Sequence, residues 1–394
     1  MTKVKGKVGA AVIGTGSIAE IAHFPSIKNL PQVDLIAVAD VVEDKVKSAA
    51  KRWGAKAWYT DYQDMLKRDD VDVVIVATPN SQHYEQAMAA MQAGLHVIVE
   101  KPLAVTNGQA WKMVEMSKKA GVRLMTGTNQ RFWLPNEIGK GLVTQGMIGD
   151  VKMGRTSLHE GWNLYHEEIS HTPFRAQAEL AGAGAIFDLG AHRVDLLLWL
   201  MGSKPKRMTG IVKRIGTPEA YTNLDDAYVI LIEFENGSIG FVSGDRFSPA
   251  VSNIQELYGT DGTMFLSTEA TNPFQSAPLA LYSNKDYTWD ELPEIVQKYR
   301  YPINFWAEDL AGEHVQKRWM TITPPREWSY TRMWDHFADC ILTGKEPMMK
   351  AEDGAIAMDV MCGTFVAFEQ GSWLDLPLKE EVVPPMYKPF YKEL

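Results

Sequence analysis

The stretch that decides the fold is Val8-Gly9-Ala10-Ala11-Val12-Ile13-Gly14-Thr15-Gly16-Ser17-Ile18-Ala19, an apolar run followed directly by the pattern G-x-G-x-x-A. The apolar run suits a buried strand, and a helical pattern follows it. In such a strand–turn–helix the first glycine permits a tight turn, the second lets backbone approach a pyrophosphate, and the alanine allows close helix–strand packing. The helix N-terminus offers N–H groups to phosphate oxygens. The stretch therefore predicts a dinucleotide-binding turn.

The residues after this turn bear on the choice of cofactor. Glycine-rich turns also occur without a nucleotide, so the context decides. A second apolar run, Val33–Ala39, ends in Asp40, at the spacing expected for an acid that binds a ribose 2'-hydroxyl. A carboxylate there repels a 2'-phosphate, and the next two residues, Val41 and Val42, are not arginines. We therefore expect NAD as the cofactor, with NADP as the less favoured alternative.

Up to about residue 128 the chain alternates short apolar runs with helical patterns, which is typical of a parallel sheet with helices on both faces. We predict strands at Val8–Ile13, Val33–Ala39, Val71–Ala77, His96–Val99 and Arg123–Thr126, and helices at Ile18–Asn29, Val42–Trp53, His83–Ala93 and Gly108–Ala120. This part is an α/β Rossmann dinucleotide-binding domain, residues 1–128.

After Asn129 the pattern changes to one helix, Ala185–Met201, and a series of alternating runs that predict an antiparallel sheet. Asn236-Gly237 between two of these runs is a strong hairpin signal. The predicted strands are Met208–Lys213, Ala227–Glu235, Ser238–Ser243, Asn253–Gly259 and Gly262–Leu266, and two helices follow at Ser329–Leu342 and Glu352–Glu369. We assign residues 129–375 to a substrate-binding and oligomerisation domain, read 285–325 as an insertion, and assign 376–394 to an extended arm.

Composition limits the partners. The formal net charge of -9 and the pI near 5.6 argue against a nucleic acid or an anionic membrane, since both select for basic surfaces. No apolar run approaches the roughly 20 residues that span a bilayer. The apolar run after Lys3, Lys5 and Lys7 is too short for a cleaved signal. Two cysteines, both in predicted helices, favour a reducing compartment, so we expect a cytoplasmic protein.

Polar residues follow the predicted strands where an open α/β sheet binds ligands, beyond the carboxyl ends of its strands. Thr78-Pro79-Asn80 and His83 follow the third strand, and Glu100-Lys101-Pro102 follows the fourth. Farther along, Asp188 and His192 lie one helical turn apart on one face. Oxidation of a carbinol needs a hydride acceptor and a base for the hydroxyl proton. His192 titrates near neutrality and Lys101 can be desolvated, so either could handle that proton.

These motifs resemble the glucose-fructose oxidoreductase / inositol dehydrogenase / MocA family over nearly the whole chain. The resemblance rests on the nucleotide turn, T-P-x-x-x-H, E-K-P, Asn129-Gln130-Arg131-Phe132 and the G-x-G-x-x-x-D-x-x-x-H helix that starts at Gly182. It implies a Rossmann domain and a second α/β domain with a large open sheet that forms a homodimer or homotetramer. The chain departs from the family at Ala183, where glycine is common, and at Phe174, where tryptophan is common.

The resemblance also implies roles for individual residues. Lys101 is similar to the family's catalytic lysine, and Asp188 and His192 to its polar pair beside the substrate; a cis peptide bond before Pro102 is a further implication. The predicted cofactor-binding residues are Gly14, Thr15, Gly16, Ser17, Ile18, Asp40, Thr78, Pro79, Asn80, His83, Glu100, Lys101, Asn129 and Arg175. The predicted substrate-binding residues are Lys101, Arg131, Trp162, Tyr165, Asp188 and His192.

The stretch from Leu158 to Arg175 is rich in His, Glu, Trp and Tyr, a mixture that suits the C–H faces and hydroxyl edges of sugars. It lacks the ligand spacing of a recognised metal site, so we expect no metal. Asp188 and His192 could instead be an ordinary helix pair, Lys101 a surface lysine and His83 a solvated residue.

We therefore expect an NAD-dependent oxidoreductase acting on a carbinol carbon of a sugar, cyclitol or related polyol. The alternative is a glycosidase or lyase that oxidises its sugar transiently, eliminates and reduces again. A non-catalytic nucleotide sensor is a third possibility, but such proteins usually lose the lysine or histidine that this chain keeps. Net formation of NADH distinguishes the first two.

Overall fold

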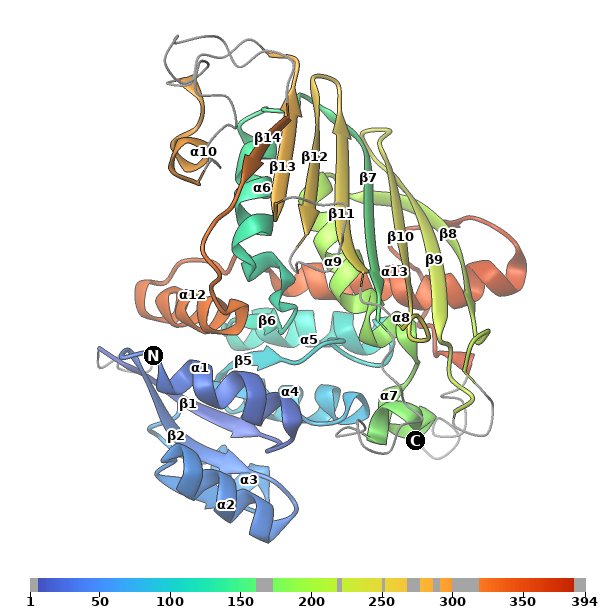
Figure 1. Ribbon diagram of the computed structural model, residues 1–394. Helices are drawn as coiled ribbons and strands as arrows, with labels where there is room; N and C mark the ends of the chain where they lie inside the picture. The colour runs from blue at the N-terminus through green and yellow to red at the C-terminus, as the bar shows by residue number, and fades with distance from the viewer. Residues whose placement is uncertain are drawn as a thin grey trace.

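The structure is a computed structural model with two sheets, one near the N-terminus and a larger one built from the later part of the chain (Figure 1). It describes residues 6–160, 173–217, 222–249, 252–267, 277–285, 291–299 and 319–385.

The first sheet is six-stranded and parallel throughout, with strand order β3-β2-β1-β4-β5-β6. The strand order reverses beside β1, and this switch point is where open α/β sheets bind ligands. The prediction of a Rossmann sheet is confirmed, and only the short edge strand β3 was missed. The strands are β1 (Val8–Ile13), β2 (Val33–Ala39), β3 (Ala57–Tyr59), β4 (Val73–Val76), β5 (His96–Val99) and β6 (Leu124–Thr126).

Helices cover both faces of this sheet, so alternate residues of a strand enter two different cores. Ala11 and Ile13 of β1 belong to the core that extends to the second domain, whereas Ala10 and Val12 belong to the core on the opposite face. This two-sided burial explains the continuous apolar runs in the sequence. The helices here are α1 (Phe24–Lys28), α2 (Glu43–Trp53), α3 (Tyr62–Met65), α4 (His83–Gln92) and α5 (Asn107–Ala120), with the 3-10 turn η2 (Asn80–Gln82) before α4.

The helix after the glycine turn contains a π-helical segment, η1 (Ala19–His23), directly before α1. Pro25 lies in the first turn of α1 and has no N–H to donate to the preceding turn. The wider π turn places the ring of His23 in the interior, where it reaches Glu100. Such single π turns occur often at functional sites.

The second sheet has nine strands in the order β14-β13-β12-β11-β7-β10-β9-β8-β15. Its pairs are antiparallel except β7 with β10, which run parallel, so the prediction of an antiparallel sheet is correct apart from that pair. The strands are β7 (Val151–His159), β8 (Pro205–Lys213), β9 (Ala227–Phe234), β10 (Ile239–Asp245), β11 (Ser252–Gly259), β12 (Gly262–Ser267), β13 (Leu279–Ser283), β14 (Trp319–Ile322) and β15 (Leu374–Asp375).

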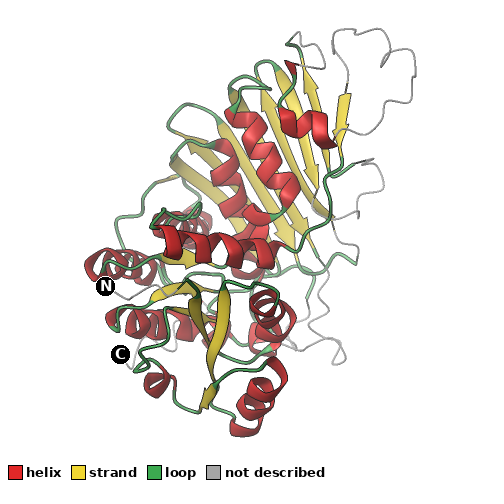
Figure 2. Cartoon of the chain, turned by 90° about the vertical axis from the view of Figure 1, so that its left-hand side faces the viewer, coloured by secondary structure: helices red, strands yellow, loops and turns green. Residues whose placement is uncertain are grey.

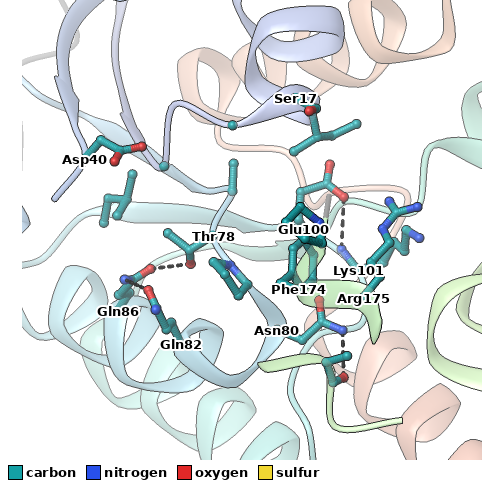
Figure 3. Close-up of a pocket in the computed structure, with 18 of the residues that line it drawn as sticks. Ser17, Asp40, Thr78, Asn80, Gln82, Gln86, Glu100, Lys101, Phe174 and Arg175 are labelled. Carbon is teal, nitrogen blue, oxygen red and sulfur yellow. Dashed lines mark hydrogen bonds between the residues drawn. The ribbon is translucent and has the colours of Figure 1, made fainter. Parts of the chain in front are cut away.

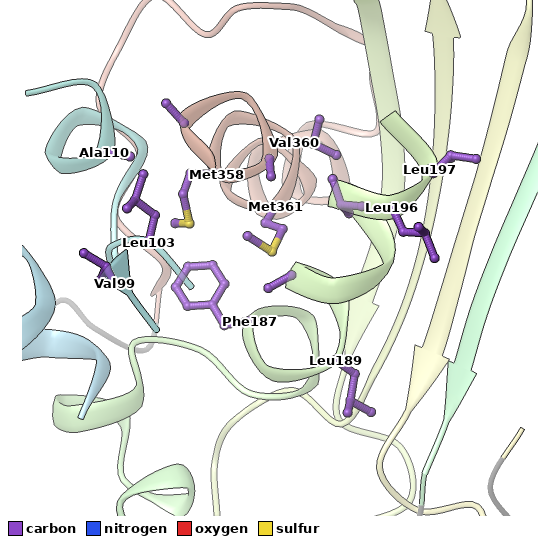
Figure 4. Close-up of a cluster of buried hydrophobic side chains, with 14 of the residues drawn as sticks. Val99, Leu103, Ala110, Phe187, Leu189, Leu196, Leu197, Met358, Val360 and Met361 are labelled. Atoms are coloured by element: carbon purple, nitrogen blue, oxygen red, sulfur yellow. The ribbon is translucent and has the colours of Figure 1, made fainter. Parts of the chain in front are cut away.

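Helices pack on one face of the nine-stranded sheet, as Figure 2 shows. The single helix predicted at Ala185–Met201 is divided at Leu189 into two helices. Phe187, Met358 and Met361 lie in the core that these helices share with Leu103 of the first domain (Figure 4). The helices are α6 (Leu134–Thr144), α7 (Ala178–Ala181), α8 (Ala185–Asp188), α9 (Gly190–Met201) and α13 (Ala351–Gln370), with the 3-10 turns η3 (Asn129–Phe132) and η4 (Pro173–Ala176).

The last part of the chain returns to the first domain. Helix α12 (Ser329–Thr343) packs against α1 and η1, and its Met333, Trp334 and Phe337 complete the core that Val12 enters. Beyond β15, Glu381 accepts a hydrogen bond from the Thr106 hydroxyl, at the cap of α5. The domain boundaries that we placed at residues 128 and 375 stay a prediction. The contacts described here connect the parts of the chain that carry the two sheets.

Two further expectations concern segments that the structure describes in part. In the range 285–325, read from the sequence as an insertion, β14 extends the large sheet beside β13 and α10 (Glu294–Tyr299) packs at its end; residues 286–290 and 300–318 lie outside the described residues. Within the described ranges, the structure contains no helix with the length and apolar character needed to cross a membrane.

Candidate active site

A pocket of about 580 Å³ lies beyond the carboxyl ends of β1, β2, β4 and β5 and reaches the second domain. Figure 3 shows its lining, with Asp40 on one side and Lys101 and Arg175 on the other. Of the predicted site residues, those that line it are Gly14, Gly16, Ser17, Ile18, Asp40, Thr78, Pro79, Asn80, Glu100, Lys101, Arg175 and Asp188.

The glycine turn forms one end of the pocket, which we call the nucleotide end. Gly14 has φ 92°, and a Cβ atom there would lie 2.5 Å from the carbonyl oxygen of Ala77, so β1 and β4 could not approach as they do. A Cβ on Gly16 would meet no atom within 4 Å and would extend into open space. Gly14 is therefore needed by the fold, whereas Gly16 leaves room for a ligand.

Asp40 shapes the glycine turn and also faces the pocket. Its Oδ2 accepts hydrogen bonds from the backbone N–H of Thr15 (2.9 Å) and from the Thr15 hydroxyl (2.8 Å), and its Oδ1 accepts one from the N–H of Val42 (3.1 Å). Lys45 Nζ lies 3.8 Å from Oδ2. Thr15 is fully buried and holds Asp40 without lining the pocket itself.

Lys101 forms the opposite, substrate end. The peptide bond before Pro102 is cis, as predicted. Lys101 Nζ donates to the backbone oxygen of Asp188 at 2.8 Å and lies 2.5 Å from Asp188 Oδ1. Burial lowers the pKa of Lys101 well below its usual range; the positive charges of Arg175 and Arg246 lower it further, against an opposing effect of nearby carboxylates. These surroundings favour the neutral amine, a form that can accept a proton.

The carboxylate of Asp188 contacts basic side chains from both domains. Besides Lys101, Arg175 Nη1 lies 3.3 Å from Asp188 Oδ2, and Arg246 forms an ion pair with the same oxygen. Lys101 follows a strand of the first sheet, whereas Asp188 and Arg246 belong to the second domain. The substrate end is therefore lined by side chains from both domains.

Glu100 is fixed by a buried chain of hydrogen bonds. Trp334 Nε1–H donates to His23 Nδ1 at 3.0 Å, so the ring proton of His23 is on Nε2, which donates to Glu100 Oε1 at 2.9 Å. Glu100 Oε2 accepts from the backbone N–H of Lys101 at 3.2 Å. The indole N–H is only a donor, and this fact alone assigns the tautomer. The chain of contacts runs from α12 to the loop that carries Lys101.

His192 lies close to this end but does not line the pocket. Burial lowers its pKa well below the usual range, and Lys101, Arg193 and Arg175 add to the effect through their charges. The helix break at Leu189 separates it from Asp188, which ends α8, while His192 lies in the first turn of α9. Its Nδ1 is buried and has no hydrogen-bond partner among the described residues.

Several predicted site residues hold the scaffold instead of lining the pocket. Both ring nitrogens of His83 face carbonyl oxygens, of Pro102 at 2.8 Å and Thr78 at 2.9 Å, and burial lowers its pKa. His83 therefore ties the two loops that follow β4 and β5. The guanidinium of Arg131 forms ion pairs with Asp195 and Asp353, and the side chain of Asn129 donates a hydrogen bond to Ser329 Oγ. The two other predicted substrate-binding residues, Trp162 and Tyr165, lie outside the described residues.

Sequence reasoning missed several residues of the pocket, above all Arg246, which directly follows β10. Lys101 was predicted because it is a polar residue just beyond the end of a buried strand. Arg246 has the same position relative to β10 and could have been predicted in the same way. The other lining residues missed include Lys45, Thr60, Tyr62, Gln82, Gln86 and Phe174. Among the described residues, no group of three or more His, Cys, Asp or Glu side chains could hold a metal ion; the absence of a metal stays a prediction.

A nucleotide turn at the switch point of a parallel sheet, joined to a buried lysine and carboxylate, defines a dinucleotide-dependent oxidoreductase. A model of the NAD-binding Rossmann fold of an oxidoreductase family matches residues 8–128, and a model of the GFO/IDH/MocA C-terminal domain matches residues 139–265. The chain belongs to this Gfo/Idh/MocA family of NAD-dependent oxidoreductases.

Among its relatives, scyllo-inositol 2-dehydrogenase (NAD(+)) of Bacillus subtilis is 24% identical over 95% of this chain and 97% of its own length. Levoglucosan dehydrogenase of Pseudarthrobacter phenanthrenivorans is 28% identical over 69% of this chain and 75% of its own. A solved levoglucosan dehydrogenase in complex with NADH superimposes with a TM-score of 0.77 at 22% identity, covering 94% of this chain and 99% of the other, which shows the same fold.

Proposed function

We propose that this protein oxidises a carbinol carbon of a sugar, cyclitol or related polyol, with NAD as the hydride acceptor and Lys101 as the proton acceptor. The observation that carries the proposal is the buried Lys101 amine, held against Asp188 at the substrate end of the pocket. The relatives named for inositol and levoglucosan dehydrogenases support the substrate class.

The side chains of the substrate end suit proton removal. The bound cofactor supplies the site that accepts the hydride, because nicotinamide carries that chemistry itself. The neutral Lys101 amine takes the hydroxyl proton as the carbinol carbon loses hydride, so the carbinol becomes a carbonyl and Lys101 becomes an ammonium ion. Asp188, 2.5 Å away, stabilises that new charge. Proton transfer by a positioned group of this kind contributes about 10²–10⁴ in rate.

We assign His192 to the same proton chemistry. Its neutral ring lies within the electrostatic influence of Lys101 and Arg175. A neutral imidazole can take the proton from Lys101 or hydrogen-bond the substrate oxygen. Glu100 has a positioning role, because His23 holds it and it in turn accepts the backbone N–H of Lys101.

The experiment that tests this function is a panel of inositols, free sugars and glycosides, incubated with NAD or NADP, with NADH absorbance and product analysis read in parallel. We expect NADH to accumulate with at least one polyol and a ketone or lactone to form in equal amount. Release of an aglycone without NADH would instead support the redox-neutral glycosidase or lyase. Tight NADH binding with no product from any compound would contradict an enzymatic role.

We also propose that the nine-stranded sheet forms a homodimer or homotetramer. Its face opposite α9 and α13 exposes Ile211, Val229, Leu231 and Ile239 on adjacent strands, an apolar surface that a monomer rarely leaves bare. Sedimentation of Leu231→Glu should show a smaller species than the parent protein, and a monomeric parent would contradict the proposal.

We further propose that the protein is located in the cytoplasm, because Cys340 and Cys362 are free and buried.

A further inference from the structure

Arg246 is a buried cation whose hydrogen-bonding capacity is largely unused. Its side chain is 1% exposed, yet it lines the pocket. Nη2 forms an ion pair with Asp188, whereas Nε and Nη1 have no hydrogen-bond partner among the residues that the structure describes. Unmet donors on a buried charged group are costly, and such groups in native proteins are usually paired or face a ligand.

Hydrogen bonds hold the backbone around Arg246, and burial together with the ion pair to Asp188 restrains its guanidinium. The N–H of Arg246 donates to the carbonyl oxygen of Asp226 at 2.9 Å. The carboxylate of Asp245 accepts hydrogen bonds from the N–H groups of Phe247 and Ser248 at 3.1 Å and 2.8 Å. A recognition group that is fixed before the ligand arrives loses little entropy on binding.

Two guanidinium groups, those of Arg175 and Arg246, lie close together at this end of the pocket. One carboxylate, Asp188, is shared by Lys101, Arg175 and Arg246. Burial, and after it the charge of Arg175, lower the pKa of Arg246 to about 9, while Glu160 acts in the opposite direction. An added anion would relieve the repulsion between the two guanidinium groups.

We propose that the substrate is a polyhydroxylated acid, such as a uronic or aldonic acid, and that Arg246 binds its carboxylate. The inference rests on the proposed function and adds a substrate class to it. A guanidinium matches the planar carboxylate through parallel N–H···O bonds, which a neutral sugar hydroxyl does not reproduce. Arg246 extends from the second domain beside Asp188, at the end of the pocket opposite Asp40, so the carboxylate lies away from the ribose side.

The test uses pairs of compounds that differ only in the acid. Methyl glucoside is compared with methyl glucuronide, methyl galactoside with methyl galacturonide, and sorbitol with gluconate, by NADH formation and by binding to the NADH-loaded protein. Charge-assisted hydrogen bonds predict that the acid of at least one pair is preferred by about 10- to 100-fold. Arg246→Met should abolish that preference, Arg246→Lys should restore part of it, and the surface variant Arg207→Met should keep it.

The outcomes separate this inference from the proposed function. Equal or better binding and oxidation of the neutral member in every pair would overturn the inference while leaving the dehydrogenase intact. Binding of an acid without NADH formation from any compound would contradict the proposed function and keep the inference. A loss of NADH affinity in a folded Arg246→Met protein would show that Arg246 binds a cofactor phosphate, which would also overturn the inference.

Discussion

At the nucleotide end of the pocket, Gly14 and Gly16 leave the turn between β1 and the following helix free of side chains. At the substrate end the surface consists of buried charged side chains, with Lys101, Arg175 and Arg246 arranged around one carboxylate. A glycine turn of the first kind is common to proteins that bind dinucleotides, whereas the substrate class that we propose depends on the side chains of the second. Substitutions at the two ends should therefore fail in different ways.

The largest effect is expected at the substrate end, from Lys101→Met. Removal of the proton acceptor should lower kcat by about 10²–10⁴-fold, because general base catalysis contributes that much. The dissociation constant for NADH should stay within a few-fold, measured by fluorescence titration. Lys47→Met, a lysine-to-methionine change at an exposed pair with Glu43, is the matched control and should leave both quantities unchanged. Near-normal turnover of Lys101→Met would place the chemistry elsewhere.

The two glycines at the nucleotide end should separate folding from binding. Gly14→Ala forces a left-handed backbone and a close contact with Ala77, so we expect a loss of about 1–3 kcal/mol or more in stability and a lower melting temperature. Gly16→Ala should melt like the parent protein and bind NADH more weakly, because its methyl group enters the ligand space. Equal behaviour of the two variants in thermal melting and NADH titration would contradict this division.

A smaller effect is expected from Asp40→Ser, which removes the charge that opposes a 2'-phosphate. Two unit charges 4 Å apart in water repel each other by ~1 kcal/mol, which corresponds to about a fivefold change in a dissociation constant. We therefore expect the ratio of the NADPH dissociation constant to the NADH dissociation constant to fall by about fivefold. Asp40→Asn is a useful companion, since its amide oxygen can still accept a hydrogen bond from Thr15. Preference of the parent protein for NADPH would show that Asp40 does not select the cofactor.

The smallest effect is a shift in pH dependence from Arg175→Met. Lys101 accepts a proton only when neutral, so the rate of oxidation rises with pH through the lowered pKa of Lys101. After burial, the charge of Arg175 contributes most to that lowering, so its removal should move the midpoint of kcat against pH upward. Arg207→Met on the far sheet should leave the midpoint in place. A downward shift would contradict the assignment of Lys101 as the base.

The sequence predicted the first sheet well because its strands are buried on both faces and appear as uninterrupted apolar runs. The bounds of β1, β2 and β5 agree with the prediction to the residue. The second sheet was harder, since β7 carries exposed Lys152 and Arg155 around Gly154 and lacks a clear alternation. Helix α6 was missed because Gly139 weakens its helical pattern, yet this glycine lets α6 approach Leu266 closely.

The candidate site was predictable where chemistry depends on position along a strand, as for Lys101 beyond β5. It was not predictable where a partner comes from a distant part of the chain. Arg131 has the residue type of a substrate ligand, but Asp195 and Asp353 occupy its guanidinium. Arg246 shows the converse, since only the assembled structure places it beside Asp188. Pairing of buried charges is a tertiary property that one sequence does not display.

Helix α12 has a consequence for how the protein is made on the ribosome. The nucleotide-binding part is synthesised first, but its core is completed by Met333, Trp334 and Phe337, about 200 residues beyond its end at residue 128. Domains usually fold as they leave the ribosome. Here the first half exposes apolar surface until α12 has been synthesised, and the indole that holds His23 is part of the same helix. Truncation before α12 would therefore leave that surface uncovered and His23 without its indole partner, so the surroundings of Lys101 are complete only once α12 has packed.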